Sequence, residues 1–99
     1  MKSKRAKACD ISPKVKKIVY ERDKGNCVLC CRRGNPNAHY IKRSQGGLGI
    51  PENVVTLCPD CQYQEDFGQN SKWYEERIKE YLQSIYEDWN EEKLIYKKW

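Results

Sequence analysis

The chain has 99 residues, of which 38% are hydrophobic and 33% are charged, and its net charge is +5. A chain of this length forms one domain with a small apolar core, which typically needs disulfides or a metal for stability. No apolar leader is present, and no run approaches the roughly 20 apolar residues that span a bilayer. The sequence therefore excludes a membrane-spanning protein and predicts a cytoplasmic one.

The first predicted helix follows a basic start. Residues 1–11 are basic and poor in apolar positions, which predicts a disordered tail. Ser12 and Pro13 are typical of a helix start, an N-cap followed by proline at the first position. The helix is predicted to run to Asp23, with its basic residues, Arg22 included, pointing outward.

A strand, a loop, a second strand and a helix are predicted next. Residues 38–42 form a short extended run, and a glycine-rich loop follows it. The β-branched residues of 54–57 indicate the second strand of a hairpin. A helix then begins near the second cysteine pair and ends at about Phe67. This region, about 37–68, predicts a small α+β core within a single domain covering 12–99.

Helices are also predicted over about 71–99. The apolar residues from Tyr74 to Tyr86 recur at helical spacing, and a last short helix begins near Asn90. This pattern favours packing in the core, with a docking surface for a protein partner as the alternative.

Charge is distributed unevenly along the chain. Residues 1–43 carry 13 Lys and Arg against 3 Asp and Glu, or +10, whereas residues 44–99 carry 6 against 11, or −5. A basic half is typical of a nucleic-acid-binding protein, and a solvated basic tail is the alternative interpretation. The candidate nucleic-acid contacts are Lys14, Lys16, Lys17, Arg32, Arg33, Lys42 and Arg43.

Two Cys-x-x-Cys pairs, 27 residues apart, supply four thiols. They are Cys27, Cys30, Cys58 and Cys61. Four thiolates at this spacing suit a tetrahedral, structural zinc ion, and disulfides or a redox pair are the alternatives. Cys31 is a possible substitute for Cys30 as a ligand, and Cys9 is expected to be a free thiol in the tail.

Several polar residues are predicted to converge between and after these pairs. His39 lies in the first strand, near its start, Asn53 ends the loop, and Gln62 and Asp66 lie four residues apart on the helix, hence on one side of it. An imidazole can take a proton from water at neutral pH, and a divalent cation held by oxygen ligands can stabilise charge on a phosphate. This set is typical of phosphodiester hydrolysis.

The chain resembles the HNH endonucleases, especially the small ones of bacteriophages and prophages. The resemblance covers about residues 12–68 and rests on CVLC, then AHYIKRSQGG, then PENVVTLCPDC. It implies a ββα-metal (His-Me finger) fold with a four-cysteine zinc, and DNA as the substrate. It also implies that His39 is the general base, that Asn53 orients the loop and contacts the metal, and that Mg²⁺, Mn²⁺ or another divalent ion is the catalytic metal.

The chain departs from the family pattern at ligand positions. Ala38 and Gln62 stand where the family often has a metal ligand, which leaves Asp66 as the best remaining one, with Glu65 beside it. Cys31 stands where the family often has glycine. The sequence therefore predicts a DNA-cleaving or DNA-nicking enzyme. A catalytically weakened relative that binds nucleic acid or a protein partner, for example in phage DNA packaging, and a zinc-held interaction module are the alternatives.

Overall fold

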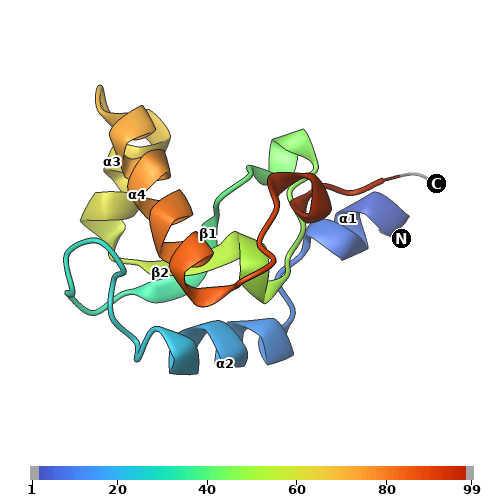
Figure 1. The fold of residues 1–99 in the computed structure, drawn as a ribbon, viewed down its shortest axis with the longest axis horizontal. Helices are drawn as coiled ribbons and strands as arrows, with labels where there is room; N and C mark the ends of the chain where they lie inside the picture. Colours follow the sequence, from blue (N-terminus) through green and yellow to red (C-terminus); the bar gives the residue numbers. More distant parts are fainter. Residues whose placement is uncertain (1–2, 98–99) are drawn as a thin grey trace.

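The computed structural model describes residues 3–97 (Figure 1). Its helices and strands are α1 (Lys4–Cys9), α2 (Pro13–Arg22), β1 (Asn35–His39), β2 (Val54–Leu57), α3 (Pro59–Phe67) and α4 (Ser71–Ile85). Three short 3₁₀ helices join them, namely η1 (Arg43–Gln45), η2 (Pro51–Asn53) and η3 (Glu91–Leu94). The small α+β fold predicted from the sequence is confirmed at this level.

The sheet consists of β1 and β2, paired antiparallel with Ala38 opposite Val55 and His39 opposite Val54. Successive side chains of a strand point to opposite faces of the sheet. Ala38 therefore faces the buried cluster that it shares with Val55 and with Ile78 of α4. The other face carries His39, and α2 runs along that side (Figure 1). The sheet thus separates the main core from the face that presents the histidine.

The first strand lies earlier in the chain than the sequence indicates. It was expected over 38–42, but β1 is Asn35–His39, with an irregular register between Asn35 and Ala38. Pairing with Leu57 outweighs the turn preference of the Asn-Pro-Asn run. His39, expected near the start of this strand, is instead its last residue, and beyond it the chain leaves the sheet and begins the loop.

α2 begins as predicted and ends in a buried polar network. Ser12 caps it by accepting from the Val15 amide at 3.2 Å. Arg22, its last residue, was expected to point outward, but its side chain is only 12% exposed. It donates to the Asp23 carboxylate at 2.8 Å. Asp23 also accepts from the Thr56 amide of β2 at 2.9 Å and from the Tyr81 hydroxyl of α4. This network ties α2 to the sheet and to α4.

The expected disordered tail is instead helical over Lys4–Cys9. The Ser3 hydroxyl caps α1 by accepting from the Ala6 amide at 3.1 Å, and Cys9 is 1% exposed. The Gly49 amide donates to the Ala8 carbonyl at 3.0 Å. Tertiary contacts with the loop before β2 therefore order a segment whose composition alone suggested disorder.

The C-terminal region covers the same loop from another side. α4 is followed by η3, capped by Asn90, and Leu94 is 1% exposed. The Leu48 amide donates to the Leu94 carbonyl at 2.8 Å, which joins the loop to this segment. The predicted helical region extended to residue 99, and its last two residues, 98–99, lie outside the described residues. No helix within the described residues is long and apolar enough to cross a membrane.

Candidate functional site: a four-cysteine cluster and a histidine cavity

The sulfur atoms of four cysteines lie together, all within 4.8 Å of one another. They belong to Cys27, Cys30, Cys58 and Cys61. Zinc–sulfur bonds of about 2.3 Å in a tetrahedron place sulfur atoms roughly 3.8 Å apart. The Cys30 and Cys58 sulfurs are 3.5 Å apart, too far for a disulfide of about 2.05 Å. The cluster fits the predicted structural zinc ion, and the disulfide alternative is not supported.

Local structure holds each cysteine pair against β2 and α3. The Val28 amide, between Cys27 and Cys30, donates to the Thr56 carbonyl at 3.0 Å. Cys58 is the N-cap of α3, and its sulfur accepts from the Cys61 amide at 3.4 Å. Burial and hydrogen bonds with the other thiols raise the pKa of Cys61. The Cys61 thiol thus resists deprotonation in the absence of a metal, and a bound dication would favour its thiolate.

Cys31 lies outside the sulfur cluster and is exposed. Its φ is +68°, a left-handed conformation that favours glycine. The geometry therefore places Cys30, and not Cys31, in the group of four thiols that could hold a zinc ion.

His39 is half-buried, and its Nε2 lies 2.8 Å from the Cys9 carbonyl oxygen. A carbonyl can only accept, so Nε2 carries the proton and Nδ1 is the basic nitrogen. Burial, with smaller effects from Arg43 and Lys42, lowers the pKa of His39 below its ordinary 6.5. The imidazole is therefore neutral at pH 7, the state required of a general base.

A cavity of about 740 Å³ opens at His39. Lys16 of α2 and Arg43 contribute positive charge to its lining, and Asp10 contributes a carboxylate that forms an ion pair with Arg43. Since Ser12 and Pro13 also line it, the N-terminal segment and the start of α2 form one of its walls. This wall could not be predicted from the sequence, because it depends on the ordered structure of residues 4–12, which were expected to be disordered.

Asn53 is fully buried and holds both ends of the loop that precedes β2. Its Oδ1 accepts from the Ile41 amide at 2.8 Å, while Nδ2 donates to the Leu48 carbonyl at 2.8 Å and to the Ile41 carbonyl at 3.2 Å. Gly47 allows this closure, because a Cβ there would lie 1.7 Å from the Ile41 carbonyl oxygen. The predicted orienting role fits these contacts, whereas a role as metal ligand does not.

The carboxylates predicted to hold a catalytic ion instead contact a lysine. Lys42 Nζ donates to Asp66 Oδ1 at 2.8 Å and to Glu65 Oε2. Glu65 is 2% exposed, and burial, followed by its hydrogen bond with Asp66, raises its pKa to about 7. Lys42 is therefore held by the two carboxylates, and its ammonium neutralises part of their charge.

The predicted divalent site is not assembled from the residues proposed for it. Ala38 is buried in the core and offers no donor, and Gln62 is half-buried on α3. Among the His, Cys, Asp and Glu side chains of residues 3–97, the four thiols are the group close enough to hold a metal. His39, Asn53 and Asp66 each bond to a different part of the chain. These residues do not fit a bound catalytic ion.

The other basic candidates lie at the surface. Lys14, Lys16 and Lys17 are exposed on α2, and Arg32 and Arg33 are exposed beside the first cysteine pair. Arg32 forms an exposed ion pair with Asp60 at 3.2 Å. The side chain of Arg43 is 49% exposed beside Asp10. Six of the seven predicted contacts therefore remain accessible for phosphate.

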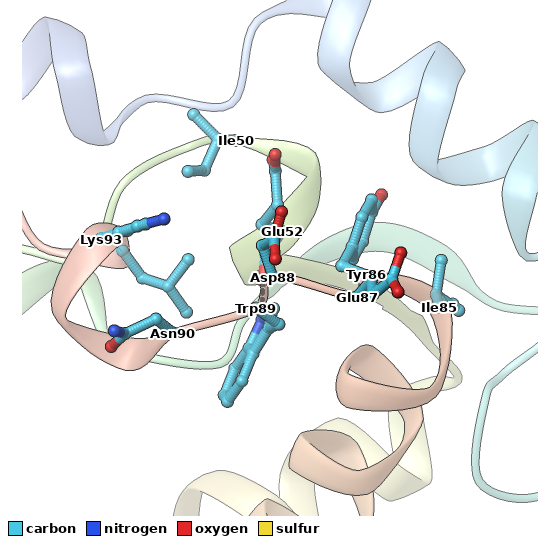
Figure 2. A pocket seen from close by; sticks show the side chains of 10 residues that line it. Ile50, Glu52, Ile85, Tyr86, Glu87, Asp88, Trp89, Asn90 and Lys93 are labelled. Atoms are coloured by element: carbon cyan, nitrogen blue, oxygen red, sulfur yellow. Dashed lines mark hydrogen bonds between the residues drawn. The ribbon is translucent and has the colours of Figure 1, made fainter.

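A second cavity, of about 360 Å³, lies between η2, the end of α4 and η3 (Figure 2). Figure 2 shows Glu52, Glu87 and Asp88 among its lining side chains, and the Trp89 indole donates to the Glu52 carbonyl at 2.7 Å. Its acidic lining disfavours an anionic ligand such as DNA phosphate.

Comparison with known proteins gives one informative similarity. No family model matches the chain. The chain is similar to the type IV methyl-directed restriction enzyme EcoKMcrA of Escherichia coli strain K12, with 33% identity over 70 residues. The similar region covers 61% of this chain and 25% of the restriction enzyme. The chain thus spans about a quarter of the length of that relative.

Proposed function

We propose that the chain is a nuclease domain that hydrolyses phosphodiester bonds in DNA, with His39 as the general base. One observation carries the proposal, namely the neutral imidazole whose proton is held by the Cys9 carbonyl and whose Nδ1 is left basic. It lies beside an open cavity with Lys16 and Arg43 in its lining. The similarity to a restriction enzyme supports the same class of reaction.

In the proposed reaction, His39 Nδ1 removes a proton from a water molecule. The water oxygen attacks phosphorus, the bond to the 3′ oxygen breaks, and that oxygen leaves with a proton from solvent. Lys16 and Arg43 bind the phosphate oxygens and stabilise the charge that develops on them. Asn53 keeps the loop that carries Arg43 in place through its three contacts with loop backbone.

A second function is favoured by a specific observation. Because Lys42 occupies Asp66 and because Ala38 and Gln62 replace usual ligands, the chain is also suited to bind DNA without cutting it. In that case the basic surface of α2 would still contact phosphates, which position a duplex with little sequence information.

The test is nicking of supercoiled plasmid by zinc-loaded protein, with and without Mg²⁺ or Mn²⁺. The first hypothesis predicts nicking by the natural chain and a loss of about 10²–10⁴-fold in His39→Ala. DNA affinity and zinc content are expected to stay unchanged in that variant. Lys72→Ala, at an exposed position of α4, is the matched control and should cleave normally.

Binding of DNA without nicking would favour the second function, a protein that binds DNA and does not cut it. If neither the natural chain nor Gln62→His nicks DNA under any of these conditions, while both bind it, the nuclease assignment is wrong.

A further inference from the structure

The strongest unexplained group outside the histidine cavity is Glu65 on α3. It is 2% exposed, and its Oε1 has no hydrogen-bond partner within the described part of the chain. A buried carboxylate with an unsatisfied oxygen is costly unless a cation lies nearby. Asp66 adds a second carboxylate beside it, since both contact the same lysine.

That cation is the ammonium of Lys42. Its side chain is 31% exposed, and Nζ contacts one oxygen of Glu65 and, at 2.8 Å, one oxygen of Asp66. Lys42 follows Ile41, whose backbone is fixed by Asn53 at 2.8 Å. The hydrogen bond between Ile41 and Asn53 thus positions Lys42 near the carboxylates. Lys42 precedes Glu65 by 23 residues in the chain.

A hard divalent cation also prefers carboxylate oxygens as ligands. The Glu65–Asp66 pair offers two carboxylates, and Oε1 of Glu65 has no other partner within the described part of the chain. An ammonium and a dication cannot share this space, because their charges repel and both would contact the same two carboxylates. We propose that Lys42 is the resident cation of the Glu65–Asp66 pair and keeps divalent ions out of it. This inference does not rest on the proposed nuclease activity, since it concerns only what the carboxylates bind.

The test measures Mn²⁺ binding to zinc-loaded protein by calorimetry and by electron paramagnetic resonance. Mn²⁺ suits oxygen ligands and competes poorly for thiolates, so the zinc cluster stays loaded. Lys42→Met, which keeps the side-chain length but removes the charge, is expected to bind Mn²⁺ at least about tenfold more tightly than the natural chain. Adding Glu65→Gln to Lys42→Met should abolish the gain, and Lys72→Met should leave binding unchanged.

Equal Mn²⁺ affinity of Lys42→Met and the natural chain would overturn the proposal. A second measurement on the natural chain guards against misfolding of the variant. Mn²⁺ broadens the amide resonances of residues near a bound ion, and the proposal predicts no selective broadening over 62–67. Selective broadening there would show that the ion displaces Lys42, and the proposal would be wrong even if the variant cannot be made.

Discussion

At the scale of single residues, spacing along the chain predicted one group of side chains and missed another. The close approach of four cysteine sulfurs follows from the two Cys-x-x-Cys pairs, whereas the role of His39 as a base stays a prediction. The pairing of Lys42 with Glu65 and Asp66 does not follow from any pattern, because it joins residues 23 and 24 positions apart. The sequence suggested Asp66 as a metal ligand because its contact with Lys42 cannot be predicted from spacing.

The proposed cleavage should depend on pH through the protonation of His39. Burial, Arg43 and Lys42 hold its pKa below the ordinary 6.5, so the base stays unprotonated at lower pH than a free imidazole. Nicking rates measured across the acidic range should fall with a midpoint below about pH 6.5. Arg43→Gln removes a positive charge and should move that midpoint upward. A midpoint above 6.5 in the natural chain would contradict the assignment.

The lowered pKa of His39 also makes the stability of the folded chain depend on pH. The unfolded chain takes up the histidine proton near its ordinary pKa, whereas the folded chain resists it. The contribution of His39 to stability is therefore present above the unfolded pKa and is lost as pH falls through the folded one.

Cys31 provides a second test at this scale. A side chain at φ +68° is strained by roughly 1–2 kcal/mol, and glycine removes the strain at some cost in unfolded-state entropy. Cys31→Gly should stabilise the chain by up to about 1 kcal/mol in urea unfolding. Cys31→Ala, which keeps the strain, should not. Zinc content is expected to be equal in all three proteins, and loss of zinc in either variant would make Cys31 a ligand.

At the scale of elements, local signals predicted the starts of helices better than the limits of strands. Ser12 and Pro13 predicted the start of α2, and Pro59 that of α3, because caps act locally. The position of β1 was predicted less well, since pairing with β2 decides it. α1 was missed because contacts with a distant loop, and not its own composition, order it.

The loop between the strands depends on Asn53 more than on its own sequence. Asn53→Ala removes three hydrogen bonds to Ile41 and Leu48 and leaves buried backbone groups unsatisfied. The expected loss is about 2–4 kcal/mol in the free energy of unfolding. Urea denaturation at constant zinc content measures it. A loss below about 0.5 kcal/mol, the range of ordinary surface substitutions, would show that the loop is held by other contacts.

At the scale of the whole molecule, the four-cysteine cluster joins the loop after α2 to the start of α3, and a zinc ion bound there would cross-link the two segments. A small apolar core leaves little stability without it, and structural zinc sites contribute about 10–16 kcal/mol of apparent binding free energy in small domains. Removing zinc with a strong chelator should therefore abolish the cooperative thermal transition seen by circular dichroism. Restoring zinc should recover it. A metal-free chain that melts at the same temperature as the loaded one would contradict a structural role.

The uneven charge of the molecule predicts how DNA binding responds to salt. The affinity should fall steeply as salt rises, since bound phosphates release counterions. Lys16→Ala should reduce the slope of log affinity against log salt by about one unit and weaken binding to all sequences alike. Lys72→Ala, on the acidic half, should leave the slope unchanged. A flat salt response in the natural chain would remove the electrostatic argument for DNA.

The contact between α1 and the histidine has a consequence for any shortened form of this protein. A chain that starts at residue 12 keeps both strands and all four zinc-binding sulfurs, yet it lacks the backbone oxygen that selects the tautomer of the imidazole. Its single histidine would then be free to rotate and to exchange its proton between two nitrogens. Comparing this truncated chain with the full one would test whether the fixed tautomer matters for the proposed cleavage.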